Sequence, residues 1–270
     1  LAAITFTQGL NLLLNMFFGP VVNAARGIAV QAQTAIGQFS SNFQTALNPQ
    51  ITKSYATGDR EYMHSLIFRS AKFSFFLLLF LSLPVLIETK AILTLWLKIV
   101  PDHTVVFLRI MLCTTWVYAV SNPLITAASA TGKIKLYQSV VGGLLLLILP
   151  ISYLCLRLGL PAYSVFIVHL GMEITAQFAR LWMLRRMIRL SLREYFTKVI
   201  WRISKVTIIA LAAPLAVAYR LPGEGIWNLL TICLICAIST SMSVYWFGLT
   251  SGEKIYISSK VSSSVSKFKK

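Results

Sequence analysis

The stretch SVVGGLLLLILPISYLCL, residues 139–156, decides the fold class, because it is apolar over its whole length and contains no charged side chain. Coiled into a helix, it would be about 27 Å long, close to the ~30 Å thickness of the hydrocarbon layer of a membrane. It lacks the alternation of polar and apolar residues that marks a strand of a membrane β-barrel. The stretch therefore predicts a transmembrane helix.

The composition of the whole chain agrees with this prediction. Hydrophobic residues make up 57% of the 270 residues and charged residues 12%, about half of the ~25% charged residues of soluble domains. Apolar runs recur along the chain, which favours a helical bundle over a barrel. We expect an all-α polytopic membrane protein with about eight transmembrane helices, over residues 1–18, 21–50, 66–98, 103–130, 136–157, 161–184, 203–220 and 226–249.

The positive charge is distributed unevenly over the connections between these spans. The net charge is +17, from 25 Lys and Arg against 8 Asp and Glu. The connections alternate sides, so nineteen cations fall on one side and six on the other, and this asymmetry predicts that the richer side is cytoplasmic. We interpret the charge as topology and attraction to membrane lipids, and we expect no nucleic-acid partner. The poorer side holds Arg26, Lys90, Lys98, Arg109, Arg157 and Arg220.

Three parts are expected along the chain. Residues 1–202 form a bundle of about six spans that ends in a basic connector helix, residues 185–202, lying at the headgroup level. Residues 203–249 add two C-terminal transmembrane helices. Residues 250–270 form a Ser- and Lys-rich cytoplasmic tail. Because the sequence begins with Leu1 inside an apolar run, we also expect it to be truncated at its N-terminus.

Prolines predict where two spans end. The second span is expected to end at Asn48-Pro49, before a turn at Gly58-Asp59. The third span is expected to be interrupted by Pro84 and Glu88 and to end in a short amphipathic segment around residues 92–97. Asn122-Pro123 predicts a kink deep in the fourth span, with nearby Ser and Thr hydroxyls satisfying the carbonyls that proline leaves free.

The second span, NAARGIAVQAQTAIGQFSSNFQTALNPQ (residues 23–50), has an unusual polar face. At 100° per residue its apolar side chains fall in one arc, and amides and hydroxyls with almost no charge fill the other. A soluble surface helix would carry Lys and Glu there. This composition indicates a confined wet space or a contact with another helix.

The segment FFGPVVNAARGIAVQAQTAIGQFSSNFQTALNPQITKSYATGD, residues 17–59, followed by a charged turn and a Phe- and Leu-rich span, resembles the second lobe of bacterial polysaccharide flippases. These belong to the multidrug/oligosaccharidyl-lipid/polysaccharide exporter superfamily. The resemblance implies the C-terminal lobe of a 14-helix, two-lobe transporter whose N-terminal lobe is missing here. It also implies a function, the transfer of polyprenyl-diphosphate-linked oligosaccharides across the bacterial inner membrane by alternating access, for lipopolysaccharide O-antigen or other surface polysaccharides.

The same resemblance places the second span in the wall of a substrate cavity. Amides and hydroxyls suit a sugar chain, and fixed donors suit a diphosphate. The alternative is that these side chains only join the helix to its neighbours. Arg109 lies near the outer end of its span, where ligand binding and snorkelling are both open. The expected cavity residues are Arg26, Gln31, Gln33, Gln38, Asn42, Gln44 and Arg109.

His169 and Glu173 lie one helical turn apart in the sixth span, so their side chains can touch. A carboxylate beside a histidine in a membrane is typical of a site coupled to a proton or sodium gradient. The alternative is that the pair is buried against Arg180 and only stabilises the bundle. Beyond this coupling ion, we expect no cofactor and no metal site.

Other functions remain open. A multidrug or cation antiporter of the same superfamily would favour acidic residues in the cavity, whereas the polar arc contains none and includes Arg26. A membrane polysaccharide polymerase or ligase would carry catalytic side chains in a sizeable outer loop, and the outer loops here are short. We expect no enzyme activity and no catalytic residue.

Overall fold

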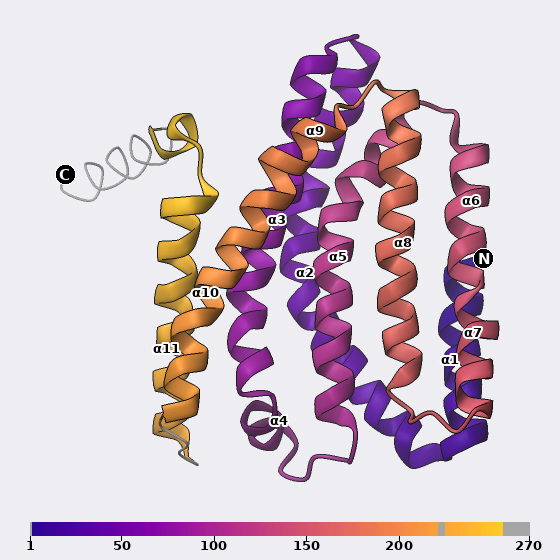
Figure 1. The fold of residues 1–270 in the computed structure, drawn as a ribbon, viewed down its shortest axis with the longest axis vertical. Coiled ribbons are helices and arrows are strands. Elements are labelled where there is room, and N and C mark those ends of the chain that lie inside the picture. Colours follow the sequence, from indigo (N-terminus) through magenta and orange to yellow (C-terminus); the bar gives the residue numbers. More distant parts are fainter. Residues whose placement is uncertain (1, 221–224, 256–270) are drawn as a thin grey trace.

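The computed structural model describes residues 2–220 and 225–255, and within these ranges it contains helices and no strand (Figure 1). The helices, with two π-helical turns η1 and η2, are α1 (Ala2–Phe18), α2 (Pro20–Ala56), α3 (Arg60–Ile87), α4 (Thr89–Leu97), α5 (Thr104–Ala130), α6 (Ile134–Leu146), α7 (Ile148–Arg157), α8 (Ser164–Met187), α9 (Leu192–Tyr195), η1 (Phe196–Ile200), α10 (Trp201–Arg220), α11 (Ile226–Ser243) and η2 (Val244–Gly248). The all-α class is confirmed.

Five helical stretches of the described chain are long and apolar enough to cross a membrane, judged by length and composition. This pattern indicates a membrane-embedded protein. One of them contains the leucine-rich stretch that opened the sequence analysis, as the stacked helices α6 and α7. The five are Arg60–Ile87, Thr104–Ala130, Ile134–Arg157, Leu192–Tyr219 and Ile226–Gly248.

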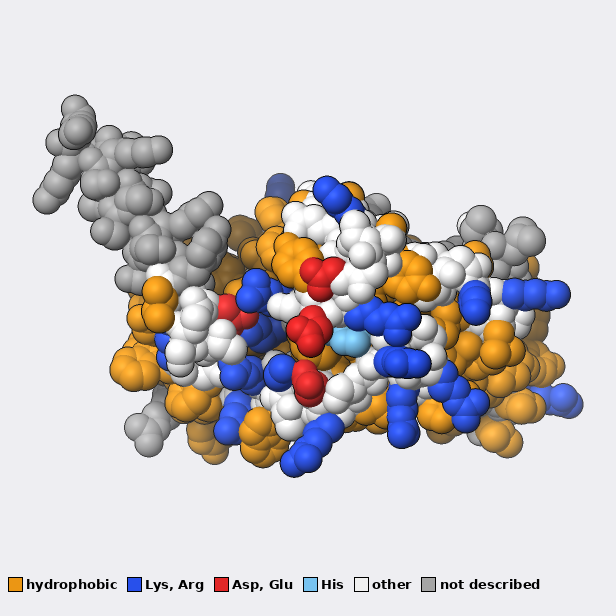
Figure 2. Space-filling model, turned by 90° about the horizontal axis from the view of Figure 1, so that it is seen from above, with side chains coloured by type: hydrophobic (Ala, Val, Ile, Leu, Met, Phe, Trp, Pro, Cys, Tyr) orange, Lys and Arg blue, Asp and Glu red, His pale blue; other side chains and the backbone are white. Residues whose placement is uncertain are grey.

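The long helices run between two ends of the bundle, and successive connections lie at opposite ends (Figure 1). The α2–α3, α5–α6 and α8–α9 connections share one end, and the α1–α2, α4–α5 and α7–α8 connections share the other. Figure 2 shows the first of these ends, where Lys and Arg side chains cover much of the surface. We call it the basic end; its exposed cations include Lys53, Lys133, Lys135, Arg185, Arg186, Arg189 and Arg193.

The second helix is longer than expected. It continues past Pro49 to Ala56, so the prediction that it ends at Asn48-Pro49 is wrong. Proline removes one backbone hydrogen bond, but Ile51 and Ser54 beyond it are buried in the bundle, and the Ser54 hydroxyl donates to the Gln50 carbonyl at 2.7 Å. Packing of this last part holds the helix together across the proline.

The third span ends at Glu88 as expected, but the predicted interruption at Pro84 is wrong, because the helix continues through this proline. Helix α3 stops at Ile87, and the short helix α4 follows it. At the other end of α3, Gly58 adopts a positive φ of 78°, and the Asp59 carboxylate accepts a hydrogen bond from the Tyr62 N–H at 3.0 Å. This cap starts the helix directly after the predicted turn.

Residues 185–202 do not form one connector helix. Helix α8 continues to Met187, and the chain then turns through residues 188–191, where Arg189 has a positive φ of 56°. The Ser191 hydroxyl accepts from the Glu194 N–H at 3.3 Å and caps α9, which runs through η1 into α10 without a break. Burial of Tyr195 and Val199 draws this segment into the bundle. The predicted tail beyond residue 255 lies outside the described residues.

Candidate substrate-facing surface

Helix α2 leaves one polar strip uncovered. Gln31, Thr34, Gln38, Ser41 and Thr45 follow one another at intervals of three and four residues, and all five are exposed, as is the neighbouring Asn42. The Gln38 amide donates to the Asn42 side chain at 2.8 Å. The strip contains no charged residue. It is an uncharged polar surface within a strongly apolar bundle, and we call these six residues the polar strip.

A shallow groove of about 230 Å³ runs beside the polar strip, between α2 and α5. Its α2 wall includes Thr34, Gln38 and Ser41, and α5 adds Thr115 and Tyr118. Tyr118 is 49% exposed. The groove therefore offers amide and hydroxyl groups beside the edge or face of an aromatic ring, a combination able to bind neutral polar ligands.

The opposite edge of the polar arc is buried against α5. The Gln33 amide donates to the Thr115 hydroxyl at 2.8 Å, and the Thr126 hydroxyl donates to the Asn48 side chain at 3.0 Å. Between them, the Gln44 amide donates to the Ala119 carbonyl at 2.6 Å. These bonds join α2 to α5 along much of their shared length. Gln33 and Gln44 thus make the helix contacts of the alternative interpretation, and both also line the groove beside the polar strip.

Pro123 explains why Gln44 is needed there. Proline has no N–H, so the carbonyl four residues earlier, that of Ala119, loses its helical donor. The Gln44 amide takes that place, while the Asn122 side chain donates to the Gln44 oxygen. The Ser and Thr hydroxyls that were expected to satisfy the free carbonyl do not donate to Ala119. The donor is a glutamine from the neighbouring helix.

The α10–α11 pair repeats this arrangement. Pro214 in α10 leaves the carbonyl of Ala210 without its helical donor, and the Ser239 hydroxyl of α11 donates to that carbonyl at 3.0 Å. In both helix pairs, a carbonyl released by proline in one helix receives a side-chain donor from the other. Proline thereby creates a specific helix–helix contact in an apolar environment.

The two arginines expected in the cavity take part in structural contacts. Arg26 is 7% exposed and donates to the Asn11 side chain and to the Thr7 carbonyl, both on α1. Arg109 is exposed, and its guanidinium donates to the carbonyls of Leu86 and Ile87 at the end of α3, at 3.1 and 3.2 Å. A cation at a helix C-terminus satisfies free carbonyls and the helix dipole.

His169 and Glu173 have different partners. The Glu173 carboxylate pairs with Arg180 at 2.8 Å, with both side chains buried. The His169 ring packs on Phe6, with ring centroids 4.5 Å apart, and no hydrogen bond joins His169 to Glu173 in the described structure. Glu173 is therefore buried against Arg180, as in the alternative in which this carboxylate only stabilises the bundle. Ion coupling stays a prediction.

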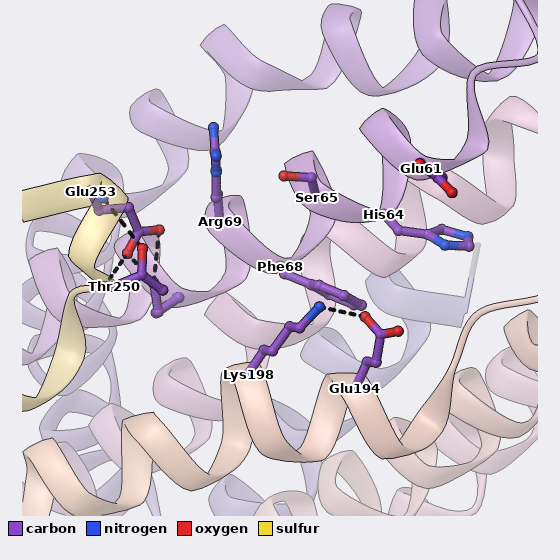
Figure 3. A pocket seen from close by; sticks show the side chains of 10 residues that line it. Glu61, His64, Ser65, Phe68, Arg69, Glu194, Lys198, Thr250 and Glu253 are labelled. Carbon is purple, nitrogen blue, oxygen red and sulfur yellow. Dashed lines mark hydrogen bonds and ion pairs between the residues drawn. The ribbon is translucent and has the colours of Figure 1, made fainter. Parts of the chain in front are cut away.

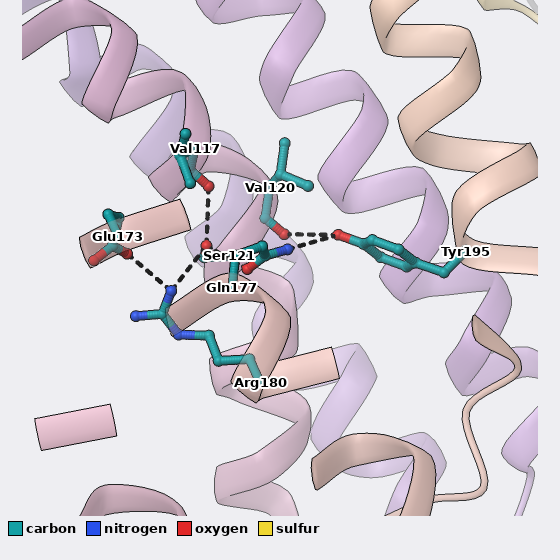
Figure 4. A network of polar contacts seen from close by, with 7 residues as sticks. All are labelled: Val117, Val120, Ser121, Glu173, Gln177, Arg180 and Tyr195. Carbon is teal, nitrogen blue, oxygen red and sulfur yellow. Dashed lines mark hydrogen bonds and ion pairs between the residues drawn. The ribbon is translucent and has the colours of Figure 1, made fainter. Parts of the chain in front are cut away.

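Arg180 extends this ion pair into a network that crosses three helices (Figure 4). Its guanidinium donates to the Ser121 hydroxyl at 3.1 Å, and Ser121 donates to the Gln177 side chain at 2.6 Å. The Gln177 amide donates to the Tyr195 hydroxyl, which donates to the Val120 carbonyl. The network ties α8 to α5 and α9, although the buried Nε of Arg180 has no hydrogen-bond partner within the described residues.

Sequence reasoning missed the α5 side of this surface. Thr115, Tyr118, Asn122 and Thr126 are spaced three, four and four residues apart along α5. That period is the same signal that identified the polar arc of α2. Two polar stripes of matching period predict helices that pair, and the two helices do pair here.

A larger cavity, of about 480 Å³, opens at the basic end between α3, α9 and the segment after η2 (Figure 3). Its charges are mostly paired: Lys198 with Glu194 at 2.6 Å, and the buried Lys72 with Glu253 at 2.6 Å. Partial burial raises the pKa of the Glu253 carboxyl, but hydrogen bonds from Lys72 and Thr250 outweigh it and hold the pKa below its ordinary value. This cavity was not predicted from the sequence.

Comparisons with protein-family models, with curated proteins and with solved structures found no match to this chain.

Proposed function

We propose that this chain is the second lobe of a flippase that moves polyprenyl-diphosphate-linked oligosaccharides across the bacterial inner membrane. The sugar headgroup would pass along the polar strip of α2, while the polyprenyl tail stays in lipid, and the two lobes would alternate access. The proposal includes about eight spans, a missing N-terminal lobe of the same protein as partner, and a cytoplasmic C-terminus. It requires no covalent chemistry.

The observation that carries the proposal is the exposure of the polar strip. Two of these side chains donate within the helix, since the Gln38 amide donates to Asn42 and the Thr45 hydroxyl donates to the Ser41 carbonyl. The remaining amide and hydroxyl groups would lack partners against acyl chains, which is costly in a membrane. A helix that leaves six such residues uncovered in an apolar bundle therefore needs water, a ligand or another polar surface opposite it. A hydrated conduit between two lobes would supply this.

The chemistry of the polar strip favours an uncharged, hydroxyl-rich ligand. A cation antiporter would need carboxylates on the exposed surface, and neither the polar strip nor the groove beside it contains one. Amides and hydroxyls form many exchangeable hydrogen bonds of moderate strength, which suits a sugar chain that must also leave. The family resemblance of residues 17–59 supports the same substrate class.

Thiol labelling tests whether the strip is hydrated. Gln38→Cys should react with a membrane-impermeant thiol reagent, in a background where the four native cysteines are replaced by Ala. Phe80→Cys, at an exposed apolar position of α3, is the matched control and should remain unlabelled. Equal protection of both cysteines would contradict a wet conduit.

Transport is tested in the organism that carries the gene. Deleting the full-length gene should make lipid-linked repeat units accumulate on the cytoplasmic leaflet, and Gln38→Leu with Asn42→Leu should reproduce at least part of that accumulation. Phe39→Leu, on the same exposed part of α2 but apolar, should transport normally. Absence of accumulation after deletion would overturn the flippase assignment even if the strip proves to be wet.

A further inference from the structure

Helices α8 and α10 diverge from the turn at residues 188–191, so that they form an inverted V at the basic end (Figure 1). A groove of about 420 Å³ lies among α8, η1 and α10, with α3 and α5 behind it. It opens at the surface of the bundle, since Ile174, Phe178 and Phe196 in its lining are exposed. The groove is separate from the polar strip, because it shares no lining residue with the groove beside that strip.

The lining of this groove is apolar. It includes Phe75, Trp116, Val117, Leu181 and Ile203. Gln177 is a polar lining residue, but its oxygen accepts from Ser121 and its amide donates to Tyr195. Water in the groove would therefore find few partners, whereas a hydrocarbon chain would bury apolar surface on every side.

Two arginines stand at the apex of the V. Arg185 follows the lining residue Leu181 by four positions, and Arg193 precedes Phe196 by three, so each lies about one helical turn from the groove toward the basic end. Both are exposed, and neither guanidinium group has a hydrogen bond or an ion pair within the described part of the chain. An apolar groove next to two unpaired guanidinium groups is complementary to an anionic lipid, whose acyl chain is apolar and whose headgroup is negatively charged.

We propose that this site binds one anionic phospholipid of the surrounding membrane, with an acyl chain in the groove and its phosphate between Arg185 and Arg193. Guanidinium groups bind phosphate oxygens through paired hydrogen bonds. A free phosphate would contact the arginines but not the groove. A neutral lipid would occupy the groove without pairing its headgroup with the arginines. The inference depends on the membrane location of the chain and not on its transport activity.

Photocrosslinking tests the proposal. Phosphatidylglycerol with a diazirine on one acyl chain is mixed into phosphatidylcholine vesicles that contain the purified protein, and the labelled peptides are identified by mass spectrometry. Label is expected on residues 113–120, 170–181 and 196–203. Replacing both arginines, Arg185→Gln with Arg193→Gln, should reduce labelling by about fivefold or more for each charge removed.

Two further variants and two competitors make the result decisive. Lys133→Gln with Lys135→Gln removes two exposed cations from the same end and should leave labelling unchanged. Val117→Phe fills the groove and should abolish labelling there. Equal labelling by diazirine phosphatidylcholine, no effect of the arginine variant, or displacement by inorganic phosphate alone would each overturn the proposal.

Discussion

Gln44 shows how one side chain can decide the contact between two helices. It is 2% exposed, and its amide satisfies the Ala119 carbonyl that Pro123 leaves without a donor. In an apolar interior, a carbonyl without a partner costs more than the loss of an ordinary hydrogen bond. The contribution of Gln44 to stability therefore depends on Pro123, which lies 79 positions away in the sequence.

We predict that Gln44→Leu lowers the free energy of unfolding by about 1–2 kcal/mol, because it leaves the Ala119 carbonyl and the Asn122 amide without their partner. Steric-trap unfolding in bicelles measures this. Gln38→Leu, at an exposed position of the same helix, should change stability by less than about 0.5 kcal/mol. In a Pro123→Ala background the cost of Gln44→Leu should shrink, since the backbone N–H returns; an undiminished cost would contradict the explanation.

At the scale of elements, the segment after η2 is held on α3 by several contacts at once. Thr250 and Glu253 form a reciprocal cap, in which the Thr250 N–H donates to the Glu253 carboxylate at 2.7 Å and the Glu253 N–H donates to the Thr250 hydroxyl at 3.3 Å. The capped carboxylate then accepts from Lys72 of α3. A Cβ at Gly248 would lie 2.7 Å from the Phe76 ring, so the backbone also packs closely against α3.

We predict that Glu253→Gln destabilises the protein by about 3–5 kcal/mol, because it leaves the buried Lys72 ammonium without a counter-charge. Glu194→Gln removes an exposed i,i+4 pair and should cost less than about 0.5 kcal/mol. Thermal unfolding of the two variants, measured side by side, checks this. Similar costs for both would show that burial of the Lys72–Glu253 pair has no special effect.

The same ion pair predicts a pH dependence. The folded-state pKa of Glu253 lies below its ordinary value of 4.5, so the pair stabilises the folded state fully above that value and progressively less as the pH falls through the lowered pKa. The protection factors of the amides of residues 249–255, which correct the exchange rates for the slower intrinsic exchange in acid, should therefore fall below about pH 4.5 in the wild type. Glu253→Gln should have low protection factors in this segment at every pH; if wild-type protection stays constant in acid, the assignment fails.

At the scale of the whole molecule, the basic end predicts the orientation in the membrane. Lys98 lies in the α4–α5 connection and Lys53 near the α2–α3 connection at the basic end; both are exposed. In whole cells, Lys98→Cys should react with an impermeant thiol reagent, and Lys53→Cys should react only after lysis. The reversed pattern would show the opposite orientation.

Much of this fold could be predicted from residue types and their periods. Apolar stretches such as residues 139–156 predict helices regardless of their neighbours, because the burial of apolar surface and the need to satisfy backbone groups act locally. The Gly58-Asp59 turn was also predicted, since glycine acts on its own backbone, whereas helices α2 and α3 continue past Pro49 and Pro84 because their surroundings hold them together. Of the expected cavity residues on α2, Gln31, Gln38 and Asn42 are exposed on the polar strip, whereas Arg26, Gln33 and Gln44 make helix contacts. That a substrate meets the strip stays a prediction.

By itself, the sequence determined that this protein is a helical bundle with a polar arc of mostly amides and hydroxyls on its second helix and a basic end, because composition and spacing are properties of one chain segment at a time. Only the tertiary structure decided which part of that arc is covered. Burial depends on where α5 places Thr115, Ala119 and Asn122, and on the carbonyl that Pro123 releases there. Donors on one helix acquire their role from acceptors on another, and that pairing exists only once the helices have packed.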